Sequence, residues 1–303
     1  RVHVLYLHQY FALPESPGGT RSYEFARRLV ERGHRVTMVT SPAMLPERFA
    51  TGRVERFSVE GIDVVVLPIA YANELGPAQR MAAFARFALR SVVVAARAPG
   101  DVVLATSTPL TIAVPGLAAR VARRRPLVFE VRDLWPEAPI AMGILRNPLL
   151  VAAARGLEWA AYHGSRSVIA LTDGMGDGVA RRGIDRARIH VIPNASDRAL
   201  FDVPEAAGEA LIVYCGTFGK VNGCAWLADL AAGLRDELPE AHVLLVGKGA
   251  ERPLIEARAR ELGVLGRTLH VWDPVPKRDL PAIFSAATIS ASTRIDVPEL
   301  WEN

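Results

Sequence analysis

Short apolar runs alternate along the whole chain with longer amphipathic segments, which is the pattern of strands followed by helices. In the first half we expect strands at residues 2–7, 35–40, 54–59, 62–67, 102–105, 127–131, 167–171 and 189–192. Helical patterns occupy residues 21–31, 78–97, 111–124, 149–163 and 174–182. Residues 54–59 and 62–67 are separated only by Glu60-Gly61 and predict a hairpin. The rest of the alternation favours parallel strands with helices on both faces of the sheet.

A second alternation begins near residue 210. Its expected strands are 210–214, 242–246, 268–271 and 288–290, and its expected helices are 224–238, 251–262 and 279–286. Pro193-Asn194-Ala195 interrupts the pattern between the halves, and residues 202–208 have the composition of a linker. We therefore expect an α/β protein with two doubly wound domains, residues 1–195 and 196–303. Because such domains commonly have five or six parallel strands, the four in the second half predict an incomplete domain.

Length and composition fit a soluble protein of two domains. The chain has 303 residues, of which 50% are hydrophobic and 22% charged. The longest apolar stretch, residues 88–96, contains Arg90 and is too short to cross a bilayer. We recognise no signal peptide, and Cys215 and Cys224 have no metal-ligand spacing, so we expect reduced thiols in a cytoplasmic protein. The net charge of +4, largely from arginine, suits phosphate-bearing ligands, an anionic membrane or nucleic acid.

Glycine-rich turns follow the opening strand of each half. The first is Pro17-Gly18-Gly19-Thr20, and the second spans residues 216–223 and includes Lys220. Glycines let the backbone approach a ligand, and a helix start behind them offers unpaired amides to a phosphate. Neither turn matches the GxGxxG or Walker A pattern, so each alone is also compatible with an ordinary strand-to-helix connection. A third turn, Gly247-Lys248-Gly249, is expected on the same sheet edge as Gly216, which favours a nucleotide site there.

Two charged segments have competing interpretations. Arg132 and Asp133 follow an apolar strand, where they either bind a substrate or form a structural pair such as Arg132–Asp133 or Arg132–Glu137. The helix at 78–97 carries Arg86, Arg90 and Arg97 on one side, and Met81, Phe84, Phe87 and Ser91 fall roughly opposite. That side is either a solvated face or a surface that lies on anionic lipid. No zinc signature and no GxSxG nucleophile motif is present.

These motifs together resemble glycosyltransferase family 4, whose GT-B architecture has two Rossmann-like domains facing across a cleft. The most specific is Arg132-Asp133-Leu134-Trp135-Pro136-Glu137, which is similar to members that build bacterial surface polysaccharides. The others are Gly18-Gly19-Thr20-Arg21, the hinge-like residues 191–195, the turns at 216–223 and 246–249, and residues 298–303. The family pattern places the acceptor in the N-terminal domain and the nucleotide sugar in the C-terminal one.

The resemblance implies a retaining glycosyltransferase that moves a sugar from a nucleotide-diphosphate donor, preferentially a UDP-sugar, to a glycan or lipid-linked acceptor. It implies no metal or other cofactor and no nucleic-acid partner. We expect a cytoplasmic location, and the basic helix at 78–97 adds the hypothesis of a lipid-linked acceptor and of peripheral contact with the inner face of the plasma membrane. The implied catalytic residues are Arg132, Asp133 and Glu302. The implied donor-binding residues are Gly18, Gly19, Gly216, Thr217, Lys220, Gly247, Val275, Lys277 and Asn303.

The chain also departs from the family pattern. Many members carry Arg and Lys where this chain has Thr217 and Asn222, and His where it has Arg132. Glu302 would match the first acid of the Glu-x7-Glu motif, and the second acid is absent from the sequence, which ends at Asn303. Two other functions therefore stay open: a nucleotide-sugar 2-epimerase of the same fold, and a non-catalytic module that binds nucleotide or glycan.

Overall fold

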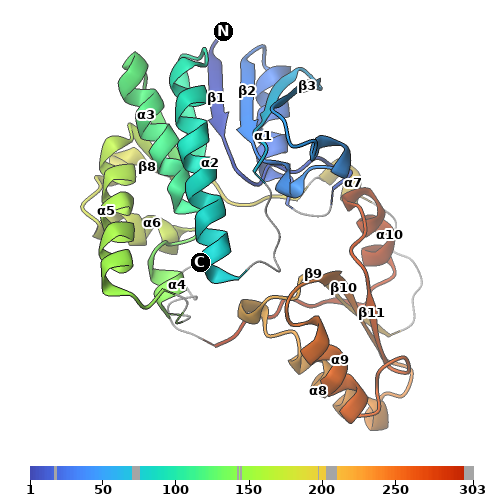
Figure 1. Cartoon of the computed structure of the whole chain (residues 1–303). Coiled ribbons are helices and arrows are strands. Elements are labelled where there is room, and N and C mark those ends of the chain that lie inside the picture. Colours follow the sequence, from blue (N-terminus) through green and yellow to red (C-terminus); the bar gives the residue numbers. More distant parts are fainter. Residues whose placement is uncertain are drawn as a thin grey trace. The chain divides into compact units, whose positions relative to one another are not determined.

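The computed structural model describes residues 1–16, 19–69, 76–141, 143, 145–196, 198–202 and 210–296 (Figure 1). They form two compact units, which we describe separately. The first consists mainly of Arg1–Leu13 and Gly19–Ala195, and the second mainly of Ser196–Asp296. In Figure 1 the first unit runs from blue to yellow-green and the second from yellow to red.

The first unit contains an eight-stranded sheet in the order β3-β4-β2-β1-β5-β6-β7-β8. The strands are β1 (His3–Leu7), β2 (Arg35–Thr40), β3 (Glu55–Val59), β4 (Ile62–Val66), β5 (Val102–Thr106), β6 (Leu127–Val131), β7 (Ser167–Ala170) and β8 (Ile189–Val191). All neighbours are parallel except β3 and β4. These two form the predicted hairpin, whose turn residues Glu60 and Gly61 both have positive φ, as a type I′ turn requires.

Helices cover both faces of this sheet. They are α1 (Arg21–Glu31), α2 (Pro77–Arg97), α3 (Ala113–Arg123), α4 (Glu137–Ala141), α5 (Pro148–Gly164) and α6 (Asp173–Arg181). Alternate residues of β1 belong to different cores: Leu5 and Leu7 pack with residues of α2, α3 and α5, whereas Val4 and Tyr6 pack with residues of α1. Burial on both faces explains why the central strands are mostly apolar. The expectation of a doubly wound parallel sheet is confirmed.

The exposed side of α2 is basic, as its sequence predicted. Phe84, Phe87 and Ser91 are buried, whereas Arg86, Arg90 and Arg97 are exposed. Met81, expected on the buried side, is exposed instead, in the second turn of the helix. The exposed side also carries two apolar side chains, Leu89 and Val93. The helix therefore packs through one stripe and presents arginines among apolar residues on the other.

The second unit contains a four-stranded parallel sheet in the order β11-β10-β9-β12. Its strands are β9 (Leu211–Thr217), β10 (His242–Lys248), β11 (Leu269–Trp272) and β12 (Ile289–Ser290). Its helices are α7 (Arg198–Phe201), α8 (Trp226–Glu237), α9 (Arg252–Glu261) and α10 (Leu280–Ser285). Residues of α8 and α9 pack on one face of the sheet, and residues of α10 pack on the other. The second Rossmann-like alternation is thus confirmed.

Two strands of this sheet extend further than the sequence predicted. We expected β9 to end at Tyr214 and β10 at Val246, with Gly216 and Gly247 in the turns that follow. Instead both glycines lie inside the strands and face each other in register. The missing Cβ explains this, because a Cβ on Gly247 would fall 1.8 Å from the Gly216 carbonyl oxygen. We expected Gly216 and Gly247 to follow the ends of the strands. Instead they lie within the strands and allow β9 and β10 to pair closely.

Candidate active site

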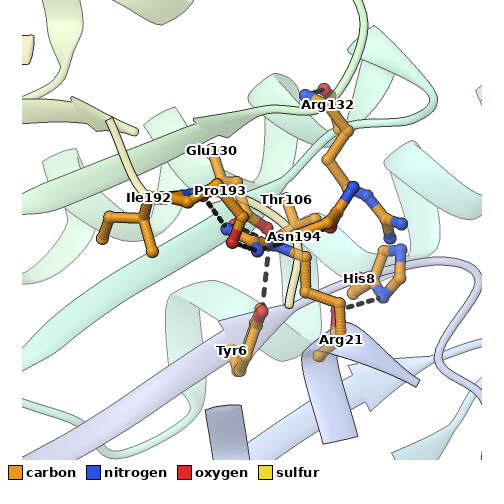
Figure 2. A network of polar contacts seen from close by, with 11 residues as sticks. Tyr6, His8, Arg21, Thr106, Glu130, Arg132, Ile192, Pro193 and Asn194 are labelled. Atoms are coloured by element: carbon orange, nitrogen blue, oxygen red, sulfur yellow. Dashed lines mark hydrogen bonds and ion pairs between the residues drawn. The ribbon is translucent and has the colours of Figure 1, made fainter. Parts of the chain in front are cut away.

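The carboxyl edge of the first sheet carries a group of polar residues around its topological switch point. The chain adds β2 and β4 on one side of β1 and β5 to β8 on the other, so the strand order reverses between β1 and β5. In open α/β sheets ligands bind just outside the carboxyl ends at such a point. His8 follows β1, Thr106 ends β5, and Arg132 follows β6. Figure 2 shows these side chains together with Arg21 and Glu130.

Arg21 and Glu130 form a buried ion pair at this edge. The Nε and Nη2 atoms of Arg21 each lie 3.0 Å from Glu130 Oε1, and the two side chains are 7% and 0% exposed. The other carboxylate oxygen of Glu130 accepts a 2.8 Å hydrogen bond from the Thr106 hydroxyl. Both oxygens of this fully buried carboxylate are therefore satisfied, as its burial requires.

The same arginine also binds the segment that leaves the last strand of the sheet. Its Nη2 donates to the carbonyl oxygen of Ile192 and its Nη1 to that of Pro193, both at 2.7 Å (Figure 2). Arg21 thus joins the start of α1 to the segment that resembles the family's interdomain hinge. The sequence pattern indicated no role for Arg21 or Glu130. The available signal was a charged residue inside the apolar strand 127–131, which must have a buried partner.

Arg132 has a different environment, because its guanidinium has no ion pair or hydrogen bond among the described residues. Its backbone N–H donates to the Ser107 hydroxyl at 3.0 Å, which fixes the backbone where it leaves β6. A Cβ on Gly19 would lie 3.8 Å from Arg132 Nη2, so Gly19 and Arg132 are neighbours. The structure therefore brings together two residues, Gly19 and Arg132, that the sequence assigned to substrate binding.

The two structural pairs considered for Arg132 are not found in the described part of the chain. The Asp133 carboxylate accepts a 2.6 Å hydrogen bond from the Thr108 hydroxyl. Glu137 forms an ion pair with Arg182. Asp133 is exposed at the same edge as Arg132, and its predicted part in catalysis stays a prediction.

His8, which lies within electrostatic reach of this arginine, and the next residue, Gln9, are both buried. His8 is 2% exposed, and its Nδ1 lies 2.8 Å from the Ser22 hydroxyl in the first turn of α1. Burial, together with the Arg132 cation, holds the pKa of His8 well below its ordinary value of 6.5. The side-chain amide of Gln9 is fully buried, and neither its nitrogen nor its oxygen has a hydrogen-bond partner among the described residues. An unsatisfied buried amide is costly unless water or a ligand reaches it.

The second unit presents its glycines at the carboxyl ends of β9 and β10. Gly216 pairs with Gly247, and Thr217 pairs with Lys248. A Cβ on Gly249 would fall 2.3 Å from the Phe218 carbonyl oxygen, so the two loops cross closely. The Thr217 carbonyl oxygen accepts hydrogen bonds from the Tyr214 hydroxyl at 3.1 Å and from Asn222 Nδ2 at 2.5 Å. These two hydrogen bonds fix the backbone at the end of β9.

Two lysines at this edge are exposed and have no ion pair among the described residues: Lys220 in the turn after β9 and Lys248 at the end of β10. The family resemblance implied donor binding for Lys220 and no role for Lys248. Its position opposite Thr217 makes Lys248 a further candidate. Burial raises the pKa of the nearby Cys215 thiol to about 11, which keeps it protonated and unreactive at neutral pH.

The remaining predicted site residues occupy different surroundings. Val275 packs against the buried cluster of Val213, Leu244 and Val246, and Lys277 begins the short turn before α10. Gly18, Glu302 and Asn303 lie outside the described residues. Within the described part of the chain, no three His, Cys, Asp or Glu side chains are grouped so that they could hold a metal ion. None of the described helices combines the length and apolarity needed to cross a membrane.

Both units have the architecture of GT-B glycosyltransferases, as comparison with solved structures shows. Sucrose-phosphate synthase from Thermosynechococcus elongatus has a TM-score of 0.69 at 17% identity, covering 96% of this chain and 75% of that one. HepE from Anabaena, in complex with UDP and glucose, has a TM-score of 0.67 at 19% identity, covering 97% and 74%. WaaG, a glycosyltransferase involved in lipopolysaccharide biosynthesis, has a TM-score of 0.64 at 15% identity, covering 96% and 75%.

Residues 18–195, more than half of the chain, match the model of the glycosyl transferase 4-like domain. The chain belongs to this family of glycosyltransferases, and the resemblance inferred from its motifs is confirmed. No curated protein sequence gave a match.

Proposed function

We propose that the protein is a retaining glycosyltransferase that transfers a sugar from a nucleotide-diphosphate donor, preferentially a UDP-sugar, to a glycan or lipid-linked acceptor. The observation that carries the proposal is the Arg132 guanidinium beside Gly19 at the switch point of the first sheet, which has no partner among the described residues. A cation in such a position is suited to an anionic ligand. The presence of UDP-glucose in a structure of HepE supports the choice of donor.

The chemistry that these residues can supply is stabilisation of the leaving diphosphate. As the bond from the sugar to the diphosphate breaks, negative charge grows on the phosphate oxygens. Arg132 and the backbone amides at the start of α1, next to Gly18 and Gly19, offer fixed positive charge and dipoles to that group. The acceptor hydroxyl attacks the anomeric carbon on the face that the diphosphate leaves, and a donor phosphate oxygen takes its proton. No protein nucleophile, metal or other cofactor takes part.

The second unit is assigned to the nucleotide. Gly216, Thr217 and Gly247 allow the backbone at the carboxyl ends of β9 and β10 to approach the diphosphate, and Lys220 adds a charge. Val275 and Lys277 contact the nucleobase. Glu302 and Asn303 bind the donor sugar. Support for this division is the grouping of Gly216, Thr217 and Gly247 at one sheet edge.

A lipid-linked acceptor and peripheral binding to an anionic membrane in the cytoplasm form part of the same proposal. The exposed side of α2 supports it, because Arg86, Arg90 and Arg97 alternate there with the exposed Leu89 and Val93. Helices that lie in the surface of a bilayer combine cationic and apolar side chains in this way.

Thermal unfolding with UDP, GDP, ADP, dTDP and NAD tests the donor assignment first. A ligand at about 100 times its Kd adds roughly 2.7 kcal/mol to the free energy of unfolding. We expect a selective shift with UDP that is lost in Arg132→Gln and kept in Arg53→Gln, which removes an exposed charge elsewhere. A shift with NAD alone, or none with any nucleotide, would contradict the proposal.

Product analysis separates the two other functions. With a UDP-sugar, the transferase releases UDP only when acceptor is present. A 2-epimerase releases UDP and a modified sugar without acceptor, and a non-catalytic module binds UDP without releasing product in either case.

A further inference from the structure

The first unit contains a cavity of about 1050 Å³ at the edge of the sheet opposite the candidate active site. Pro126, Arg166 and Arg188 line it, and these residues directly precede β6, β7 and β8. They therefore mark the amino ends of three parallel strands, whereas Arg132 marks a carboxyl end. The last turns of α3 and α5 complete the walls. Its volume is at the upper end of the range for sites that hold small organic ligands, roughly 300–1,000 Å³.

The lining of this cavity is strongly cationic. It includes His163 and five arginines, namely Arg120, Arg124, Arg125, Arg166 and Arg188, and no acidic side chain. Burial, together with the neighbouring Arg123 cation, lowers the pKa of Arg125. Charges of one sign gathered in a hollow without a counter-charge repel each other and attract anions.

Two of the five arginines have a structural explanation. The buried Arg125 guanidinium donates to the carbonyl oxygens of Ala95 at 2.8 Å and Ala119 at 3.1 Å. Arg188 Nη2 donates to the Tyr162 carbonyl oxygen at 3.2 Å, near the end of α5. Both arginines thus satisfy carbonyl groups at or near the ends of helices.

The other three have no such explanation. Arg120, Arg124 and Arg166 are exposed, and none of their guanidinium groups has a partner among the described residues. Arg124 also has φ 50° and ψ 36°, directly after the end of α3. Glycine is the usual residue in this left-handed position because a Cβ is disfavoured there. The chain therefore has a cation at a position where its backbone favours glycine.

We propose that this cavity is a second ligand site, separate from the sugar-transfer site, that binds a phosphate-bearing anion through Arg120, Arg124 and Arg166. Planar guanidinium groups bind phosphate oxygens in pairs, and the cavity has room for more than one phosphate. The site rests on the geometry of the first unit alone and does not depend on the proposed transfer reaction.

The rim of the cavity bears on where the phosphate comes from. Val121 is 69% exposed, and Trp159 is 61% exposed and stacks on His163 with ring centroids 4.6 Å apart. Exposed apolar and aromatic side chains beside arginines suit a lipid headgroup at a membrane surface. The same arginines equally suit a soluble phosphorylated molecule. Both kinds of ligand would bind the arginines through phosphate oxygens. Only a lipid would also contact the apolar side chains at the rim.

The first arm of the test uses a soluble probe. Inorganic pyrophosphate is titrated calorimetrically into the whole chain and into the double variant Arg124→Gly/Arg166→Gln. The glycine suits the left-handed backbone, so this variant should fold. The control Arg32→Gln/Arg53→Gln removes two exposed charges elsewhere. We expect at least tenfold weaker binding in the cavity variant and less than a twofold change in the control. Arg132→Gln should keep this binding, which separates it from any binding at the transfer site.

The second arm uses vesicles of phosphatidylglycerol in phosphatidylcholine, with sedimentation of bound protein as the readout. Loss of sedimentation in the cavity variant but not in the control identifies a lipid headgroup as the source. Pyrophosphate binding that depends on the cavity arginines, without vesicle binding that depends on them, identifies a soluble phosphate. If neither probe distinguishes the folded cavity variant from the control, the proposal is overturned.

Discussion

Arg21 and Glu130, 109 residues apart in the chain, form a nearly solvent-free ion pair in which two guanidinium nitrogens each lie 3.0 Å from one carboxylate oxygen. Arg21 is the first residue of α1, which follows the first glycine turn. Glu130 lies in β6, two residues before Arg132, which is in the loop after that strand. Because the same guanidinium holds the carbonyl oxygens of Ile192 and Pro193, one side chain fixes three segments at the candidate active site.

Removal of one member of this pair should destabilise the first unit strongly. We expect Arg21→Met to lower the free energy of unfolding by about 3–5 kcal/mol, because it leaves the Glu130 carboxylate buried without its counter-charge. Urea denaturation measures this. The matched control is Arg21→Met/Glu130→Leu, in which no charge is left unpaired, and it should recover much of the loss. Equal stability of Arg21→Met and the unaltered chain would show that the ion pair does not stabilise the first unit.

Arg132 should behave in the opposite way, because its guanidinium has no partner to lose among the described residues. We expect Arg132→Gln to leave the melting temperature nearly unchanged and to lower kcat for sugar transfer about 100- to 1,000-fold, the effect of removing one group that stabilises developing negative charge. Release of UDP in the presence of acceptor is the measurement. Arg182→Gln is the control, because Arg182 pairs with Glu137 and should affect stability more than kcat. A variant of Arg132 that unfolds readily but keeps its kcat would contradict the assignment.

The sequence predicted the secondary-structure elements well and the long-range pairing of side chains poorly, whereas the functions assigned to site residues stay predictions. Apolar periodicity placed α1, β2 and β6 at the bounds that the structure has, because each is a regular element with one or two buried faces. Gly19 and Arg132 were found as local motifs. The partner of Glu130 was not predictable, because no local pattern says which of many arginines meets a carboxylate 109 residues away. The length of β9 was missed because glycine indicates a turn more often than a close strand pair.

His8 should make stability depend on pH. The pKa of His8 in the folded chain is held well below 6.5 by burial and by Arg132, so the folded chain leaves it neutral where the unfolded chain begins to bind a proton. At this site the unfolded state then binds more protons, so the contribution of His8 to the free energy of unfolding falls as the pH falls below about 6.5, by at most roughly 1.4 kcal/mol per pH unit. Burial raises the pKa of Glu158 to about 7, so this acid contributes in the opposite direction over the same range. Urea denaturation at pH 7.5 and 5.5 measures the sum of these contributions.

The contribution of His8 to that difference is isolated by substitution. His8→Gln should reduce the loss of stability between pH 7.5 and 5.5, whereas the exposed His190, replaced by Gln, should leave it unchanged. The same pH dependence in both variants would show that another group is responsible.

Gly247 and Gly233 provide a matched test of the close strand pair in the second unit. A Cβ on Gly247 would collide with the Gly216 carbonyl oxygen, which is backbone and cannot rotate away, so Gly247→Ala must separate β9 from β10. Forcing extra volume into a packed backbone costs about 1–3 kcal/mol or more. Gly233 lies in α8, and a Cβ added there would have nothing within 4 Å. Gly233→Ala should therefore stabilise the unit by roughly 0.5–1 kcal/mol through helix propensity.

Gly247→Ala should lower the melting temperature, and Gly233→Ala should raise it. The two variants should also differ in nucleotide binding. Because Gly216 and Gly247 are also assigned to the diphosphate, Gly247→Ala should weaken UDP binding even where the unit stays folded. Gly233→Ala leaves the edge formed by β9 and β10 unaltered and should keep that binding. If both alanines raise the melting temperature, the strands do not approach each other as closely as described, and the assignment of this edge to the donor loses its structural basis.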